Sequence, residues 1–141
     1  MSNRITIAAA SVTMEAELND SPTAQAIWEA LPITGQANTW GDEVYFAIPV
    51  QAVEEPDARA DVVVGELGYW PPGSAFCIFF GPTPASDGPQ PRAASAVNIL
   101  GRVLGDAAEF RQVPGGTAVT LDRSNRPQTP DFQSGDKGVL S

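Results

Sequence analysis

The first regular pattern in the chain is an alternation of apolar and polar side chains over residues 4–18. Apolar side chains recur at every second position on one face of this segment: Val12, Met14, Ala16 and Leu18. A period of two is typical of a half-buried β-strand. We therefore expect one long strand, or a hairpin of two strands, at the start of the chain.

The pattern changes to helical spacing over residues 21–32. Apolar side chains at i, i+3, i+4 and i+7 form one stripe of an amphipathic helix, and here they are Ala24, Ile27, Trp28 and Leu31. Ser21 is a suitable N-cap, Pro22 suits the first helical position, and Pro32 ends the helix. The sequence therefore predicts one helix directly after the first strands.

Short runs with strand-like composition follow along the rest of the chain. We predict strands over residues 40–50, 61–67, 75–80, 97–106 and 115–121, and a short helical turn over residues 107–113. Residues 81–93 contain four prolines. Because proline donates no hydrogen bond to a sheet, this segment is predicted to be a long exposed loop.

These elements indicate a mainly β fold with one amphipathic helix and a short helical turn. We expect a closed β-barrel, because closure removes exposed strand edges. The 141 residues fit a single domain, which we place at residues 1–122. Residues 123–141 form a polar C-terminal tail, either disordered or docked on a second copy as part of a homo-oligomer.

The charge of the chain is acidic and unevenly distributed. The formal net charge is −9, and Arg59 is the only basic residue between Ile5 and Gln90. Nucleic acids and anionic membrane surfaces are therefore not expected as partners, since both require a positive face. No apolar run approaches the roughly 20 residues that cross a bilayer. We expect a cytoplasmic protein.

The residue types that most often perform catalysis are scarce. The chain has no histidine and a single cysteine, Cys77. This excludes Ser-His-Asp and Cys-His catalysis and histidine-containing zinc sites. Cys77 lies in the apolar run AFCIFF, where a buried structural thiol is expected. We expect no metal and no cofactor.

Three motifs, in order, resemble those of the cyclophilins. SPTAQAIWEAL resembles their first helix, GSAFCIFFG their Gly-Ser-Gln-Phe-Phe-Ile strand, and ILGRVLGD their Phe-Gly-Arg-Val segment. With WGDEVYF and GELGYWPPG, the chain is most similar to the small prokaryotic cyclophilin-like domain family, whose function is unassigned. The resemblance covers about residues 4–121 and implies an eight-stranded barrel related to the cyclophilin prolyl isomerases.

The resemblance also implies a catalytic arginine that this chain does not have. When VYFAIP is placed on the family's Phe-His-Arg strand, the histidine position becomes Tyr45 and the arginine position becomes Phe46. The glutamine of the Gly-Ser-Gln motif is Ala75 here. Without these electrostatic donors, a pocket that grips proline does not lower the barrier to rotation. The chain is therefore not expected to be an active prolyl isomerase.

We expect the aromatic strands to form one groove for a ligand. The candidate ligand-binding residues are Glu43, Tyr45, Phe46, Tyr69, Trp70, Phe76 and Phe79. The competing interpretation places most of these rings in the core, because aromatic side chains dominate protein interiors. Asp42 and Glu43 are adjacent, so in a strand they point to opposite faces and do not form a carboxylate pair.

Three functions are consistent with the sequence. The first is a non-catalytic binding module for a peptide or a small apolar ligand. The second is a residual peptidyl-prolyl isomerase that uses another donor, such as Arg102 in LGRVLG or a tyrosine hydroxyl, although a surface salt bridge is the simpler role for Arg102. The third is an assembly protein whose tail docks a second copy.

Overall fold

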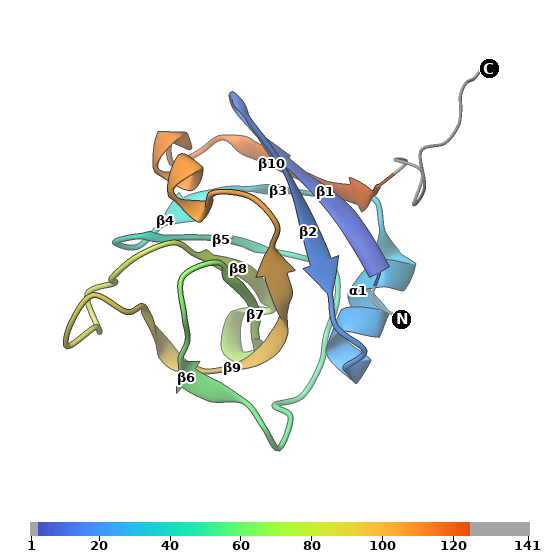
Figure 1. Ribbon diagram of the computed structural model, residues 1–141. Helices are drawn as coiled ribbons and strands as arrows, with labels where there is room; N and C mark the ends of the chain where they lie inside the picture. Colours follow the sequence, from blue (N-terminus) through green and yellow to red (C-terminus); the bar gives the residue numbers. More distant parts are fainter. Residues whose placement is uncertain (1–2, 125–141) are drawn as a thin grey trace.

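The computed structural model describes residues 3–124 of the chain (Figure 1). Its strands are β1 (Asn3–Ala9), β2 (Val12–Leu18), β3 (Ile33–Gln36), β4 (Asn38–Thr39), β5 (Glu43–Ala47), β6 (Arg59–Asp61), β7 (Glu66–Trp70), β8 (Ala75–Phe79), β9 (Arg92–Val103) and β10 (Ala118–Arg123). The helices in this part of the chain are α1 (Pro22–Ala30) and two 3-10 helices, η1 (Pro71–Gly73) and η2 (Ala107–Gln112). The fold is mainly β, as predicted.

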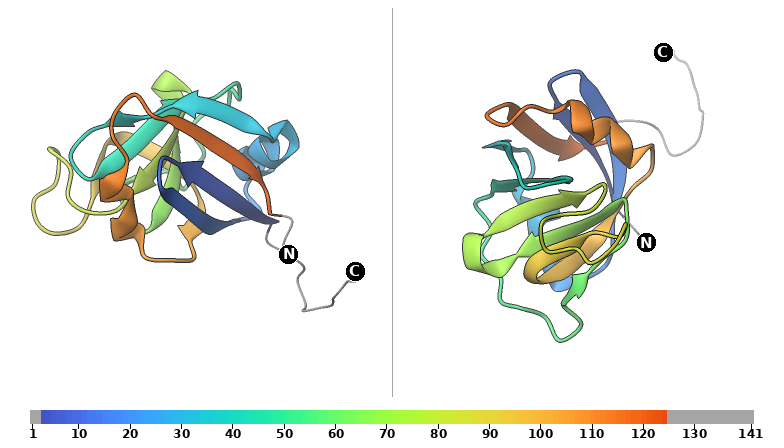
Figure 2. Two further views of the ribbon diagram at one scale, coloured as in Figure 1. Left: turned by 90° about the horizontal axis from the view of Figure 1, so that it is seen from above. Right: turned by 90° about the vertical axis from the view of Figure 1, so that its left-hand side faces the viewer.

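The sheet is strongly curved but does not close into a barrel, so the prediction of a closed β-barrel is wrong. The strands pair in the order β3-β10-β1-β2-β9-β7-β8-β5-β4, and β6 pairs with β9 beside this path. The two ends of the path, β3 and β4, are separated by the single residue Ala37, whose N–H donates to the Thr117 carbonyl oxygen at 2.8 Å. Figure 2 shows the strands wrapping around the interior. Strands β3 and β4 are therefore connected by the chain, but they are not hydrogen-bonded to each other, and the sheet stays open.

The structure confirms the first two predicted elements, the initial strands and the helix, and shows which contacts form them. The initial alternating segment is a hairpin in which Ile5 faces Ala16 and Ile7 faces Met14. Ser21 caps α1, because its hydroxyl accepts a hydrogen bond from the Ala24 N–H at 3.2 Å. The helix packs against β2 and β9 and covers one end of the sheet (Figure 1).

Two strand predictions need correction. The strand expected over residues 61–67 is instead β6 and β7, separated by a turn in which Gly65 has a φ of +95°. The strand expected from residue 97 begins five positions earlier, at Arg92. Strands β3 and β4 were not predicted, because ITGQ and NT are too short to show a period of two.

The sheet formed by β5, β8, β7 and β9 has apolar side chains on both faces. One face contributes Phe46, Phe76 and Leu67 to the main core. The opposite face contributes Cys77 and Phe79 to a smaller cluster. Because successive side chains of a strand point to opposite faces, neighbouring residues of one strand belong to different clusters.

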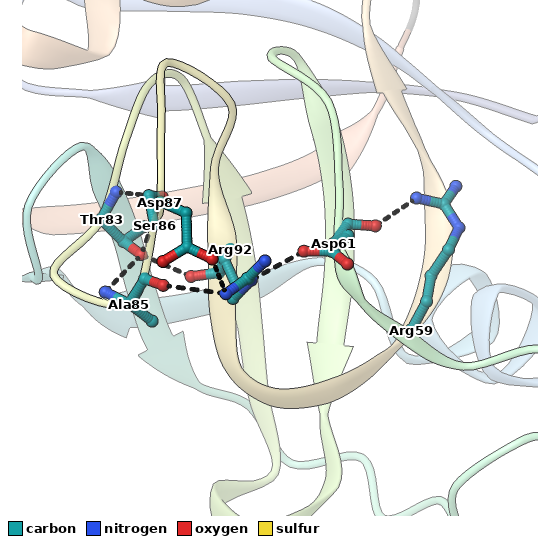
Figure 3. A network of polar contacts seen from close by, with 7 residues as sticks. All are labelled: Arg59, Asp61, Thr83, Ala85, Ser86, Asp87 and Arg92. Carbon is teal, nitrogen blue, oxygen red and sulfur yellow. Dashed lines mark hydrogen bonds and ion pairs between the residues drawn. The ribbon is translucent and has the colours of Figure 1, made fainter.

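The loop between β8 and β9 is held by a polar network (Figure 3). The Arg92 guanidinium pairs with Asp61 at 2.7 Å and with Asp87 at 2.8 Å. Thr83 donates from its hydroxyl to the Arg92 carbonyl oxygen and receives a backbone hydrogen bond from Ala85 at 3.2 Å. These contacts fix the position at which β9 begins.

A buried amide connects three segments of the chain. Asn98 on β9 is fully buried. Its amide nitrogen donates to the Thr23 hydroxyl at 3.0 Å and to the Val53 carbonyl oxygen at 2.9 Å. Its amide oxygen accepts from the Glu55 N–H at 2.8 Å. Asn98 therefore ties α1 and the segment before β6 to the centre of the sheet.

We expect the Asn98→Ala variant to lose about 2 kcal/mol of unfolding free energy, because the substitution leaves buried polar partners unsatisfied. Urea unfolding measures this loss. The matched control is Asn38→Ala, since Asn38 is exposed and its amide makes only long hydrogen bonds of 3.4 Å. Equal stabilities of the two variants would contradict the structural role of Asn98.

Two expectations concern parts of the molecule beyond the sheet. The C-terminal tail lies almost wholly outside the described residues, so its docking on a second copy stays a prediction. Within residues 3–124, no helix is both long and apolar enough to cross a membrane.

Candidate functional site

A pocket of about 250 Å³ opens on the face of the sheet that carries the smaller apolar cluster. Its walls come from the turn before β5 and from β5, β7, β8 and β9. The lining residues are Trp40, Glu43, Tyr45, Trp70, Cys77, Ala93, Ala94 and Val97. Three aromatic rings and one carboxyl group therefore surround a hollow whose remaining walls are small or aliphatic.

The hollow exists because the central positions of this face have small side chains. Gly68 on β7 lies opposite Cys77 on β8 and opposite Ile99 on β9. A Cβ atom at Gly68 would lie 2.8 Å from the Val97 Cγ2 atom and 3.3 Å from the Phe79 Cε2 atom. The absence of a side chain there lets Val97 pack against the sheet and leaves space above it.

The Trp70 ring is fixed in position before any ligand arrives. Its indole N–H donates to the Ser95 hydroxyl at 2.7 Å. The six-membered part of the ring lies against Gly73, where an added Cβ atom would be 2.9 Å from two ring carbons. A tryptophan held from two sides forms a preformed wall, which reduces the entropic cost of binding.

Glu43 is the buried polar group of the pocket. Its side chain lies on β5, and the residue is 6% exposed. Burial raises the pKa of the Glu43 carboxyl to about 7, and a hydrogen bond from the Cys77 thiol opposes this shift. Among the described residues, no other hydrogen bond or ion pair to this carboxyl is found. Since a thiol is a weak donor, the carboxyl is left largely without a partner.

Cys77 is buried, as the sequence predicts. The residue is 2% exposed, and its thiol lies 3.8 Å from the Ala75 carbonyl oxygen. Burial is the main cause that raises the pKa of this thiol well above its ordinary value, and the neighbouring Glu43 carboxyl adds to the effect. A thiol that is buried and protonated is a poor nucleophile.

Two charged residues next to pocket-lining residues in the chain, Asp42 and Arg92, are paired with other groups. Asp42 forms an ion pair with Arg111 on η2, in which the Arg111 Nη2 atom lies 2.7 Å from the Asp42 Oδ2 atom. Its side chain therefore points away from the pocket, which confirms that the two adjacent carboxylates do not form a pair. Arg92, which precedes the pocket-lining Ala93, is paired with Asp61 and Asp87. None of the described residues that line the pocket is basic.

The structure separates the seven predicted site residues into two groups. Glu43, Tyr45 and Trp70 line the pocket. Phe79 is fully buried in the smaller cluster, beside the pocket. Ligand binding by the three lining residues stays a prediction.

Phe46, Tyr69 and Phe76 do not line the pocket and are fully buried in the main core. The reason is strand alternation: Tyr45 and Phe46 are adjacent, as are Tyr69 and Trp70, so the members of each pair point to opposite faces. A single groove lined by all six rings is therefore a wrong expectation. For these three rings, and for Phe79 in the smaller buried cluster, the competing interpretation as core is confirmed.

Five lining residues were not among the predicted site residues: Trp40, Cys77, Ala93, Ala94 and Val97. Alternation along β8 could have placed Cys77 on the same face as Phe79. Trp40 lies in the turn before β5, where its N–H donates to the Glu43 carbonyl oxygen at 3.0 Å. The two alanines carry no chemical signal in the sequence.

Arg102 does not contribute to this pocket. Its side chain is 66% exposed and lies 3.7 Å from the Glu17 carboxylate. The expected surface salt bridge is therefore confirmed. In residues 3–124, no group of three or more potential metal-ligating side chains is arranged to hold an ion.

Comparisons with known proteins agree with this architecture. The structure is similar to the solution structure of the hypothetical protein AF2241 from Archaeoglobus fulgidus, with 40% identity and a TM-score of 0.75 over 87% of this chain and 95% of that one. It also resembles McbB, solved in complex with tryptophan, with 16% identity and a TM-score of 0.62 over 92% of this chain and 50% of that one. At that identity the likeness shows the fold alone.

No curated protein matches the chain. A family model described as cyclophilin-like matches residues 3–122, which is most of the sequence. The chain therefore belongs to the cyclophilin-like family.

Proposed function

We propose that this cyclophilin-like domain is a non-catalytic binding module whose pocket takes a small apolar group. The group is either a whole small ligand or one side chain of a peptide. The observation that carries the proposal is the hollow between Trp40, Tyr45 and Trp70. A concave, preformed surface with aromatic walls and few polar groups is typical of small-ligand sites.

The size of the pocket supports a small occupant. Its volume of about 250 Å³ is below the range of about 300 to 1,000 Å³ that is typical of sites for drug-sized molecules. An amino-acid side chain or a fragment of similar size is therefore the expected occupant. A longer peptide would lie across the open face and insert one side chain.

The charge of the lining argues against prolyl isomerisation. That reaction requires a donor that stabilises the twisted amide more than the planar one. Phe46, at the position that the resemblance assigns to the arginine, points into the main core, and the pocket-facing neighbour is Tyr45. In either register, β5 supplies no cation to the pocket, and Arg102 lies elsewhere.

The three tryptophans of the chain provide a direct test. The indole N–H signals of the isotope-labelled protein are recorded while N-acetyl amides of valine, phenylalanine and proline are added. We expect the signals of Trp40 and Trp70 to shift with at least one of these neutral probes. Trp28 is the internal control, because it lies on α1 with the Arg123 guanidinium 4.3 Å from its ring centre.

The same samples test catalysis, through the exchange between cis and trans forms of N-acetyl prolinamide. We expect no acceleration of exchange, and we expect Trp70→Ala to weaken the binding of whichever probe binds. Faster exchange would replace the proposal by a residual isomerase. Signals of Trp40 and Trp70 that stay unmoved by every probe would refute binding of a neutral apolar group at this pocket.

A further inference from the structure

The pocket combines three aromatic rings with a buried acid, and these two features favour the same kind of ligand. The faces of Trp and Tyr rings carry negative electrostatic potential and attract cations. Glu43 adds a carboxyl group whose only hydrogen-bond partner in the described part of the chain is a thiol. A ligand whose apolar group also carries a positive charge would pair with that carboxyl, which a neutral apolar group does not do.

Building on the proposed binding function, we propose that the ligand group is a methylated ammonium, held by Trp40, Tyr45 and Trp70 with Glu43 as its counter-ion. Such a group occurs on a free quaternary amine and on a methylated lysine of a peptide. Both sources present the same chemistry to the pocket. The acidic balance of the chain, with a net charge of −9, favours the approach of a cation.

The lining explains why a methylated ammonium fits better than an unmodified one. A primary ammonium carries three N–H donors and requires acceptors for them when it leaves water. The side-chain acceptors of the lining are the Glu43 carboxylate and the Tyr45 hydroxyl, while the polar atom of Trp70 is a donor already bonded to Ser95. A methylated ammonium keeps the charge, and its methyl groups pack against the rings without unmet donors.

Strand pairing explains how the rings and the carboxyl group come to line one pocket. Tyr45 lies directly opposite Cys77, and Glu43 lies one pleat away on the same strand. Trp70 rises from the neighbouring strand β7 and is fixed by Ser95 and Gly73. The three rings and the carboxyl group therefore line the pocket from β5, from the turn before it and from β7.

The protonation of Glu43 gives the proposal a measurable signature. In the empty pocket, burial raises the pKa of this carboxyl to about 7. A bound cation favours the ionised form and lowers that pKa, so affinity should rise as the pH increases through about 7, by up to about tenfold per pH unit on the acidic side. The other titratable groups at the pocket are the Cys77 thiol and the Tyr45 phenol, while Asp42 is held by its own arginine partner.

The experiment compares two ligands of nearly identical shape. Choline carries a trimethylammonium group, and neohexanol is the neutral alcohol in which carbon replaces the nitrogen. Both are titrated into the labelled protein while the indole signals of Trp40, Trp70 and Trp28 are followed. We expect choline to bind at least about tenfold more tightly than neohexanol and to shift only the first two signals.

Two variants identify the groups responsible. We expect Glu43→Gln to lower choline affinity by about tenfold or more, to remove its pH dependence, and to leave neohexanol binding unchanged or stronger. Trp70→Leu keeps an apolar wall but removes one ring, and it should weaken choline more than neohexanol. Far-ultraviolet circular dichroism and urea unfolding confirm that both variants are folded.

The outcomes separate this inference from the proposed function. Equal binding of the two ligands, or tighter binding of neohexanol, would overturn the cation preference and leave an apolar binding pocket. Failure of both ligands to shift Trp40 and Trp70 would overturn the inference, and the neutral amides would then decide the proposed function. A short peptide with trimethyllysine, compared with its unmodified form and with choline, distinguishes the two sources by which one binds more tightly.

Discussion

We expect the Gly101→Ala variant to be about 4 kcal/mol less stable than the unsubstituted domain. Gly101 has a φ of +145°, a backbone conformation that residues with a Cβ atom rarely adopt. An added Cβ atom would also lie 1.9 Å from the Glu17 carbonyl oxygen. Strain and overlap therefore act together at this position.

The location of Gly101 increases the consequence of the substitution. It pairs with Leu18 on β2 and with Leu67 on β7. The β2–β9 ladder is the link in the sheet between the strands of the initial hairpin and those that form the pocket. Because the added methyl group would push against the backbone of β2 and not against a flexible side chain, the link itself has to shift.

Two other glycines separate the causes of this effect. Gly65→Ala places a Cβ atom at a φ of +95°. The nearest atom, on Val103, is 3.6 Å away, which is an ordinary van der Waals contact, so the new methyl group overlaps with nothing. It should cost about 1 to 2 kcal/mol, from backbone strain alone. Gly88→Ala meets nothing within 4 Å and should be nearly neutral. Urea unfolding of the three variants measures the series, and a Gly101→Ala midpoint no lower than that of Gly65→Ala would refute the argument.

The elements that sequence reasoning predicted well are those set by local chemistry. The α1 helix begins after Ser21 and has Pro22 at its first position, because capping and a fixed φ act within a few residues. The initial hairpin follows from a period of two maintained over two strands. Whether the sheet closes depends on contacts between distant segments, such as that of Ala37 with Thr117, and no local pattern reveals them.

The candidate site was predictable only in part, for a related reason. Glu43, Tyr45 and Trp70 are chemically conspicuous candidates, and the structure places all three on one pocket. Strict alternation along β5 and β7 would have assigned Phe46 and Tyr69 to the other face. The hollow itself was not predictable, because it depends on Gly68 and on alanines contributed by β9, about 25 residues further along the chain.

Glu43 connects the binding proposal to the stability of the fold. An isolated acid in a largely apolar cluster weakens the domain whenever it is ionised, unless a ligand or partner compensates. Sites kept for binding commonly reduce stability in this way, and substitutions that remove the strain then stabilise the protein at the expense of function. If the pocket binds a cation through Glu43, replacing the Glu43 carboxyl should therefore stabilise the fold and weaken binding.

The stability of the Glu43→Gln variant should exceed that of the unsubstituted domain by about 3 kcal/mol above about pH 7, and by little at about pH 4. The folded pKa of Glu43, about 7, lies above its ordinary value of 4.5. Below the ordinary value, the carboxyl is protonated in both the folded and the unfolded chain, so its burial carries no charge penalty. As the pH rises from 4.5 to 7, the unfolded chain releases its proton first, and the free energy of unfolding falls.

Urea unfolding of both proteins across this pH range measures the difference between their unfolding free energies. The contributions of all other carboxylates cancel in that difference, because both proteins contain them. Glu54→Gln is the matched control, because Glu54 is exposed and its substitution should change stability by about the same small amount at every pH. A stability difference between the Glu43→Gln protein and the unsubstituted domain that does not grow with pH would mean that this carboxyl is solvated. In that case, its role as a buried counter-ion in the pocket would be lost together with its effect on stability.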